Sequence, residues 1–350
     1  MLHAPRFAHR LLRKMTLLAV AAILPLVLVP QASPATVVNG AGATFPYPLY
    51  SKWFAEYAKV DTSSSFVYQP VGSGEGVRQL LAGSVDFCGT DFLPTSQQLE
   101  GAADNIVRIP TVIGAVAVVY RIPGMGKGLK LPPDLLADIF RGEVAAWDDP
   151  RIRKANPKLW LPSRKINVVH RSDGSGTTDI FTDYLSKASQ PWRREVGRGM
   201  TVDWPAGVGR KGNGEVTVEV KKTEYSIGYV ELIYALESNL TYAFIRNRSG
   251  RYVEPDLGTI RKAAFASAVA TSGQPVSLVN QPGEDSYPIV GLTWLLVYQH
   301  QKDHHKGRSL VSFLDWALSK GQALAPFLLY APLPENLASQ ARKAVRSIRY

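Results

Sequence analysis

Residues 171–178, Arg-Ser-Asp-Gly-Ser-Gly-Thr-Thr, decide how this chain is organised. The residues before them, 165–170, alternate in polarity and are rich in β-branched side chains, which predicts a strand. The residues after them, 179–185, carry apolar side chains at helical spacing, which predicts a helix. A strand-to-helix turn of small hydroxyl residues leaves unpaired backbone N–H groups at the positive end of a helix. Such a turn suits an anion.

Arg171 enters the turn, and a planar guanidinium grips a phosphate or carboxylate with two hydrogen bonds. A simpler interpretation is equally consistent with these residues alone. In that interpretation Asp173 or Ser175 only caps the helix, and Gly174 and Gly176 only allow the bend.

Two further stretches favour the anion. Residues 39–48 form a small-residue turn before a predicted helix over 49–57, and residues 69–77 lie between a predicted strand at 66–68 and a helix at 77–81. Three glycine- and hydroxyl-rich helix starts in one chain indicate a single anion held by several converging helix N-termini.

The composition points to a globular protein with two lobes. A chain of 350 residues is too long for one typical core. The formal charge of +11 is scattered along the chain, which disfavours nucleic-acid binding. The glycine-rich residues 207–214 lack the spacing of a nucleotide-binding P-loop, and Lys211 among them is expected to face solvent. His300, His304 and His305 are expected in a solvated loop rather than at a metal.

The first 35 residues are typical of a secretory signal. A basic segment to Lys14 is followed by an apolar run over 17–29 and a small-residue exit over 31–35. We expect cleavage after Ala35, with Ala32 as the other possible site and an uncleaved membrane anchor as the alternative. Cys88 is the only cysteine, which excludes an internal disulfide and a lipidated cysteine at the cleavage point. Its apolar surroundings predict an inert core residue.

The remaining pattern predicts alternating strands and helices. A long apolar run over 109–120 suits a strand that crosses between the lobes, and residues 275–289 could form the return crossing. A helix is predicted over 132–140, and loops over 147–150 and 156–162. Asp91 follows a predicted strand over 83–89, at an end where ligands collect in open α/β sheets, although it could equally cap the next turn. The end of the chain predicts a strand over 288–298 and helices over 310–318 and 337–348.

Motifs along nearly all of the chain after residue 35 support one family. They are, in order, Gly40-Ala-Gly-Ala-Thr44-Phe45-Pro46, Gly72-Ser73, Val85-Asp-Phe87 with Asp91, Ile109-Pro-Thr-Val-Ile-Gly114, Trp147-Asp-Asp149, Arg171-x-Asp-Gly-Ser-Gly-Thr177, Gly207-x-Gly-x-Lys-Gly-Asn213, Ile227-Gly-Tyr-Val230, Asn280-Gln-x-Gly-Glu-Asp285 and Phe313-x-Asp-Trp316. In this combination the chain resembles the phosphate-binding proteins of high-affinity phosphate ABC importers.

The resemblance implies an α/β, two-lobed periplasmic-binding-protein type II fold, with a ligand cleft between two α/β domains joined by a two-strand hinge. It implies a signal peptide over 1–35, lobe I over 36–112 and 286–350, and lobe II over 113–285. It also implies a binding protein without a catalytic step or a cofactor. Such a protein captures inorganic phosphate in the periplasm and delivers it to an inner-membrane ABC permease and its ATPase complex. A monomer suits a shuttling receptor of this kind.

The resemblance also implies the binding residues. The set expected at the phosphate is Thr44, Phe45, Ser73, Asp91, Arg171, Ser175, Gly176 and Thr177, with Asp173 holding the arginine. Asp91 would accept a proton carried by phosphate. Sulfate carries no proton at neutral pH and would leave this carboxylate unpaired, which costs roughly 1–3 kcal/mol or more. Two positions depart from the family pattern: Glu75 would weaken binding if it pointed inward, and His170 stands where another base is common.

Two alternatives stay open. One is a secreted phosphatase with Ser175 or Thr44 as the nucleophile, although such a serine or threonine needs a positioned base or a metal. The other keeps the fold and changes the ligand to another oxyanion, such as sulfate or molybdate, or to an organic phosphate.

Overall fold

The computed structural model describes residues 35–99, 101–268 and 277–350. The predicted signal segment, apart from Ala35, lies outside these residues. Everything below refers to the unit formed by residues 35–350.

The described chain contains one large mixed sheet. Its strands follow the order β2-β1-β3-β12-β4-β8-β6-β7, and β9 pairs with β4 beside this path. Their bounds are β1 Thr36–Gly42, β2 Ser64–Gln69, β3 Phe87–Thr90, β4 Ile106–Arg121, β6 Asn167–Arg171, β7 Val208–Arg210, β8 Ser226–Glu231, β9 Thr241–Tyr242 and β12 Val290–Tyr298. A small second sheet has the order β11-β10-β5, with β5 Lys130–Leu131, β10 Phe244–Arg246 and β11 Tyr252–Val253.

Strand β4 connects two groups of strands. Its first half pairs antiparallel with β12, from Ile106 opposite Tyr298 to Ala115 opposite Val290. Its second half pairs antiparallel with β8, from Val116 opposite Glu231 onward. The long apolar run over 109–120 is therefore the crossing strand that the sequence predicts, and it is buried over almost its whole length because strands or helices cover both faces.

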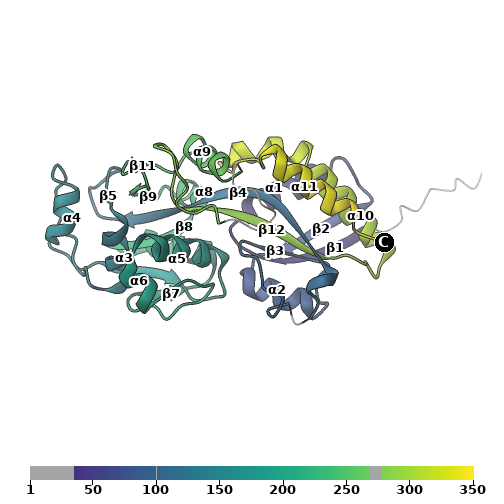
Figure 1. The fold of residues 1–350 in the computed structure, drawn as a ribbon, viewed down its shortest axis with the longest axis horizontal. Coiled ribbons are helices and arrows are strands. Elements are labelled where there is room, and N and C mark those ends of the chain that lie inside the picture. Colours follow the sequence, from purple (N-terminus) through teal and green to yellow (C-terminus); the bar gives the residue numbers. More distant parts are fainter. Residues whose placement is uncertain (1–34, 100, 269–276) are drawn as a thin grey trace, which may run out of the picture. The chain divides into compact units, whose positions relative to one another are not determined.

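Helices cover both groups of strands (Figure 1). Their bounds are α1 Tyr47–Tyr57, α2 Ser73–Leu81, α3 Pro133–Arg141, α4 Pro150–Ala155, α5 Gly176–Ala188, α6 Gln190–Glu195, α7 Gly212–Lys222, α8 Leu232–Glu237, α9 Leu257–Ala268, α10 His304–Ala317 and α11 Glu335–Arg346, with 3-10 turns at Ala103–Asn105 and Lys320–Leu328. Helices α2 and α10 both contact β1, and α7 contacts β6 and β8. These are parallel strands with helices against them, which is the α/β arrangement expected from the sequence.

Local sequence explains where several helices begin and end. Helix α3 has Pro133 in its first turn and ends at Gly142, whose φ of 80° is the left-handed conformation that glycine adopts at low cost. Helix α2 begins at Ser73, earlier than the predicted start at residue 77, because the glycines in its first turn mask the helical pattern.

Three loop predictions were wrong in part, and the loop over 156–162 is confirmed. The loop predicted over 147–150 ends one residue early, because Pro150 starts α4 after Asp149 caps it. The glycine stretch 207–214 contains β7 and the start of α7. His304 and His305 begin α10, because Asp303 accepts hydrogen bonds from two backbone N–H groups of the first turn.

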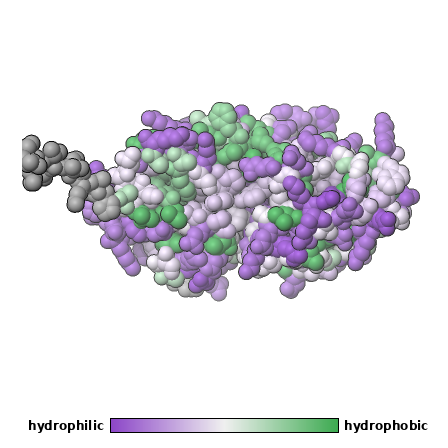
Figure 2. Space-filling view, turned by 180° about the vertical axis from the view of Figure 1, so that it is seen from behind, coloured by the Kyte–Doolittle hydropathy of each residue, from purple (hydrophilic) through white to green (hydrophobic). Residues whose placement is uncertain are grey.

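Buried aromatic and aliphatic side chains fill the space between the sheet and the helices. Trp53 of α1 and Phe313 of α10 are almost fully buried, and Phe54 stacks on Phe66 of β2. The surface differs: Figure 2 shows hydrophilic side chains over most of one face, with apolar side chains in separate groups. Cys88 lies in the core with no exposed surface, as predicted, and burial raises the pKa of its thiol.

Candidate functional site

The expected binding residues lie at the N-terminal ends of helices. Thr44 and Phe45 precede α1, Ser73 opens α2, and Ser175 caps α5. A fourth helix, α7, begins beside them at Gly212 and brings Asn213 into the group. Unpaired N–H groups and the positive ends of helix dipoles therefore gather in one place, as the three helix starts in the sequence indicate.

Arg171, at the end of β6, is a buried cation. Its Nε donates to Oδ1 of Asp173 over 2.7 Å and its Nη2 donates to Oδ2 over 2.5 Å. Burial alone would raise the pKa of Asp173, but the Arg171 guanidinium outweighs burial and holds this pKa below its usual value. The Arg171 side chain is only 1% exposed, so the two bonds fix the direction of its remaining edge, where Nη1 donates to Thr177 Oγ1.

Ser175 caps α5 as the simpler interpretation of the stretch expects. Its Oγ accepts the N–H of Thr178 over 3.0 Å, and the residue is fully buried. Capping and anion binding are compatible, because a hydroxyl that accepts one hydrogen bond still has its proton to donate. The cap therefore fixes the hydroxyl of Ser175 with its proton free to point elsewhere.

Asn213 connects two of the expected binding residues. Its Nδ2 donates to Oγ1 of Thr44 over 2.8 Å and to Oγ1 of Thr177 over 3.2 Å, while its Oδ1 accepts the N–H of Glu231. The backbone N–H of Asn213 also donates to Thr44 Oγ1. Asn213 belongs to one of the family motifs, but the motif alone predicts no role for it. The glycine before it was the available signal, since a glycine at a helix start often allows a close approach.

The four hydroxyl groups of the site share one feature: each accepts a hydrogen bond from the protein. Thr44 accepts from Asn213, Thr177 from Arg171 and Asn213, and Ser175 from Thr178; the Oγ of Ser73 accepts the N–H of Asp91 over 3.3 Å. Thr44 and Thr177 each accept two such bonds and Ser73 and Ser175 one, and in every case these bonds leave the hydroxyl proton to be donated. The site therefore presents hydroxyl donors next to a buried arginine, a chemistry that fits an oxyanion.

Asp91 is the carboxyl group placed among these donors. It is 5% exposed, and Thr293 of β12 donates to its Oδ1 over 2.8 Å. Burial raises the pKa of Asp91 to about 7, although the bond from Thr293 and the charge of Arg171 lower it. A carboxyl with a pKa near neutrality exchanges a proton easily with a ligand that also titrates there. Thr293 lies inside an apolar strand, and no sequence signal pointed to it.

Gly176 explains why Asp91 can approach α5. A Cβ built on Gly176 would lie 2.6 Å from the Cβ of Asp91 and from the Oγ of Ser73, which is closer than real contacts allow. The absence of a side chain therefore lets α5, Asp91 and Ser73 meet. Gly72, with φ of 97°, lies against the Asp173 carboxylate in the same way.

Helices α2 and α5 meet directly at their N-terminal ends. The N–H of Gly74 donates to the carbonyl oxygen of Gly174 over 2.9 Å. Tyr234 of α8 donates from its hydroxyl to the carbonyl oxygen of Thr44, and the Tyr330 hydroxyl donates to that of Phe45. These bonds join residues from distant parts of the chain around the site.

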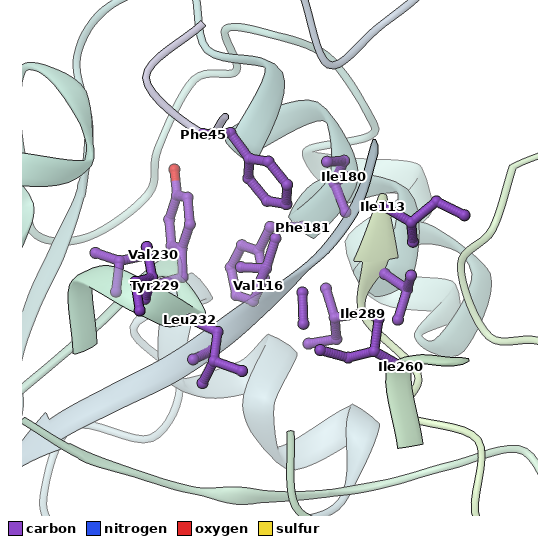
Figure 3. Close-up of a cluster of buried hydrophobic side chains, with 14 of the residues drawn as sticks. Phe45, Ile113, Val116, Ile180, Phe181, Tyr229, Val230, Leu232, Ile260 and Ile289 are labelled. Carbon is purple, nitrogen blue, oxygen red and sulfur yellow. The ribbon is translucent and has the colours of Figure 1, made fainter. Parts of the chain in front are cut away.

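The ring of Phe45 points away from the polar groups. It lies in a buried apolar cluster with Ile180 and Phe181 of α5 (Figure 3) and contacts Tyr330 edge to face. The backbone of Phe45, rather than its side chain, is therefore the part that lies at the site, as the resemblance implies.

The two departures from the family pattern do not enter the site. Glu75 receives hydrogen bonds from Arg78 and Gln79 along α2, and the bond from Arg78 contributes most to lowering the pKa of Glu75 to about 2. His170 stacks on Trp204 at 4.8 Å, and burial lowers its pKa. Lys211 faces solvent, as predicted.

Among residues 35–99, 101–268 and 277–350, no group of three or more His, Cys, Asp or Glu side chains is placed to hold a metal ion. No helix in this part of the chain is long and apolar enough to cross a membrane. His300 pairs with Arg349 through the backbone, and the ring of His304 contacts that of Tyr350.

Comparison with known proteins defines the class first. A family model described as the PBP superfamily domain matches residues 29–320. The crystal structure of a DING protein superposes with a TM-score of 0.70 at 22% identity, covering 87% of this chain and 93% of that one. A high-affinity periplasmic phosphate-binding protein (PfluDING) solved with phosphate gives a TM-score of 0.67 at 20% identity, covering 88% and 93%. These structures show the two-lobed periplasmic-binding-protein type II fold.

Sequence relatives define the particular family. Phosphate-binding protein PstS of Pasteurella multocida (strain Pm70) is 40% identical over 305 residues, which cover 87% of this chain and 88% of that protein. Phosphate-binding protein PstS of Methanocaldococcus jannaschii is 40% identical over 340 residues, covering 89% and 86%. The chain belongs to the PstS family of phosphate-binding proteins.

Proposed function

We propose that this protein captures inorganic phosphate at the site formed by Thr44, Phe45, Ser73, Asp91, Arg171, Ser175, Gly176 and Thr177, with Asp173 holding the arginine. The observation that carries the proposal is the set of hydroxyl groups that accept hydrogen bonds from the protein and keep their protons to donate, beside buried Arg171. The names of the PstS relatives support the same ligand.

Asp91 gives the site its preference for phosphate. A group of donors that encloses one carboxyl suits an oxyanion that carries a proton, because the proton joins the ligand oxygen to Asp91 Oδ2 or Oδ1. Sulfate brings no proton at neutral pH, and its oxygens would repel this carboxylate. We expect a large loss of affinity for sulfate, since an unpaired buried charge costs more than the roughly 1–3 kcal/mol of a neutral group.

Phosphate binds between two lobes in this proposal, lobe I over 36–112 and 286–350 and lobe II over 113–285. Two contacts support a site between these lobes: the bonds from Asn213 to Thr44 and from Gly74 to Gly174 each join one proposed lobe to the other around the site. Strand β4, which pairs with β12 in one group of strands and with β8 in the other, would form one crossing of the hinge. The predicted return crossing over 275–289, of which residues 277–289 are described, would form the other.

The protein would act as a receptor rather than an enzyme. It would reach the periplasm through the signal segment over 1–35, act as a monomer without a cofactor, and deliver phosphate to an inner-membrane ABC permease and its ATPase. Ser175 supports this role, because its Oγ accepts from the backbone of its own helix and His170 stacks on Trp204 instead of serving as its base.

Calorimetric titration of the purified, phosphate-stripped protein tests the proposal. Phosphate near neutral pH should bind tightly at one site, and sulfate under the same conditions should give no binding heat. Absence of phosphate binding would refute the proposed function. Turnover of a chromogenic phosphate ester that disappears in Ser175→Ala would support the phosphatase instead. Uptake of labelled phosphate by cells with and without the gene would test delivery to the permease.

A further inference from the structure

Helix α5 carries two buried acids just behind its N-terminal end. Asp179 lies in the first turn and Asp183 one turn later, and they are 7% and 4% exposed. An acid in the first turn stabilises a free helix, because it complements the positive end of the dipole. The same charge opposes an anion that binds at Ser175 to Thr177, only a few residues away, so it needs compensation.

Arg198 supplies a cation to both acids. Its Nε donates to Asp179 Oδ1 over 3.0 Å and its Nη2 to Asp179 Oδ2 over 2.7 Å, and its Nη1 lies 3.3 Å from Asp183 Oδ2. Lys187, one turn further along α5, also donates a hydrogen bond from its Nζ to Asp183 Oδ2. Arg198 lies beyond α6, in a stretch without any motif, so only the fold brings it to α5.

The two acids and Arg198 line the same cavity as Asp91, the proposed proton acceptor. Asp91, Asp179, Asp183 and Arg198 all line one cavity of about 230 Å³. After burial, Thr293 and Arg171, the charge of Asp179 is among the causes that set the pKa of Asp91, and it acts to raise it. The two carboxylates are therefore close enough to affect each other through the cavity.

We infer that Arg198 sets the affinity of the α5 site for its anion by cancelling the charge of Asp179. The inference rests on the proposed function, since it concerns the same site. Arg198 is a positioning and charge-compensating residue and touches none of the ligand oxygens in this account. Without it, a buried carboxylate would repel both the bound anion and the ionised form of Asp91.

The test compares R198Q, D179N and the R198Q/D179N double variant by calorimetric titration with inorganic phosphate. R198Q should weaken phosphate binding on the order of tenfold or more, as expected for one uncompensated charge near a partly buried anion. D179N alone should bind at least as tightly as wild type, and the double variant should return to within a few fold of it. Higher salt should reduce the defect of R198Q.

R141Q is the matched control, because it removes the same charge and Arg141, which is 14% exposed, pairs with Asp138 and Glu195 in the same proposed lobe. It should leave the affinity unchanged. If Arg198 has only a structural role, adding D179N to R198Q should weaken phosphate binding further or leave it as weak as in R198Q. Either result would overturn the inference. Wild-type affinity in R198Q would also overturn it. If R198Q does not fold, D179N decides the question: weaker phosphate binding by D179N than by wild type would overturn the inference.

The test separates this inference from the proposed function. Wild-type protein that does not bind phosphate refutes both. Wild-type protein that binds phosphate while the R198Q and D179N variants behave alike refutes only the charge compensation by Arg198.

Discussion

Replacing Asn213 by aspartate should abolish the donor arrangement while keeping the shape of the side chain. In the protein, Asn213 Nδ2 donates to Thr44 over 2.8 Å and to Thr177 over 3.2 Å, so the protons of both hydroxyls point away from it. A carboxylate at this position accepts instead of donating. Both hydroxyls would then turn to donate to it, and the ligand would lose two donors.

The magnitude follows from those two bonds. A hydrogen bond to a charged group contributes roughly 1.5–3 kcal/mol, so the loss of two amounts to about 3–6 kcal/mol. That corresponds to a phosphate affinity on the order of 10²- to 10⁴-fold weaker in Asn213→Asp, before the repulsion from the new charge is counted.

Calorimetric titration with phosphate near neutral pH measures this effect. Asn156→Asp is the matched control, because Asn156 is also buried and its Nδ2 donates to the carbonyl oxygens of Lys130 in β5 and Ile152 in α4, outside the site. The control should be less stable and should bind phosphate like wild type. Phosphate binding by Asn213→Asp within about threefold of wild type would show that the hydroxyls are not oriented by this amide.

Four other predictions concern the charged groups and the cysteine. Arg171→Ala should weaken phosphate binding more than tenfold, because Asp173 and the ligand oxygens lose their buried cation; titration of this variant against Arg141→Ala decides the placement. Asp91→Asn should narrow the preference for phosphate over sulfate, and unchanged selectivity would argue against the proton-acceptor role. Burial raises the pKa of Asp91 to about 7 in the phosphate-free fold, from about 3.9 in the unfolded chain. The contribution of Asp91 to the free energy of unfolding is therefore fully present below about pH 4, and it is lost as the pH rises through 7. Urea unfolding should therefore show Asp91→Asn gaining stability relative to wild type between pH 4 and pH 8. Cys88 should react with a thiol reagent only after unfolding, and rapid reaction of the native protein would contradict its burial.

Much of the fold could be predicted because its signals are local. About fifteen residues or fewer are enough to predict three of its elements. These are the apolar run that forms β4, helix α3 with its first proline, and the hydroxyl-rich start of α5. The predicted starts of helices were wrong where glycines interrupt the helical pattern. For that reason α2 begins at Ser73 and α7 begins inside the glycine stretch, where the sequence indicates only a loop.

The candidate site was only half determined by the sequence. The pairing of Arg171 with Asp173 spans two residues, and the capping of α5 by Ser175 spans three, so the chain itself brings these groups together. The tertiary structure alone decided that Asn213 meets Thr44, that Thr293 donates to Asp91, and that Arg198 reaches Asp179. These contacts join residues from different strands, helices and loops. Local sequence spacing does not encode which buried donor will face which acceptor, because the packing of the sheet and the helices determines these pairs.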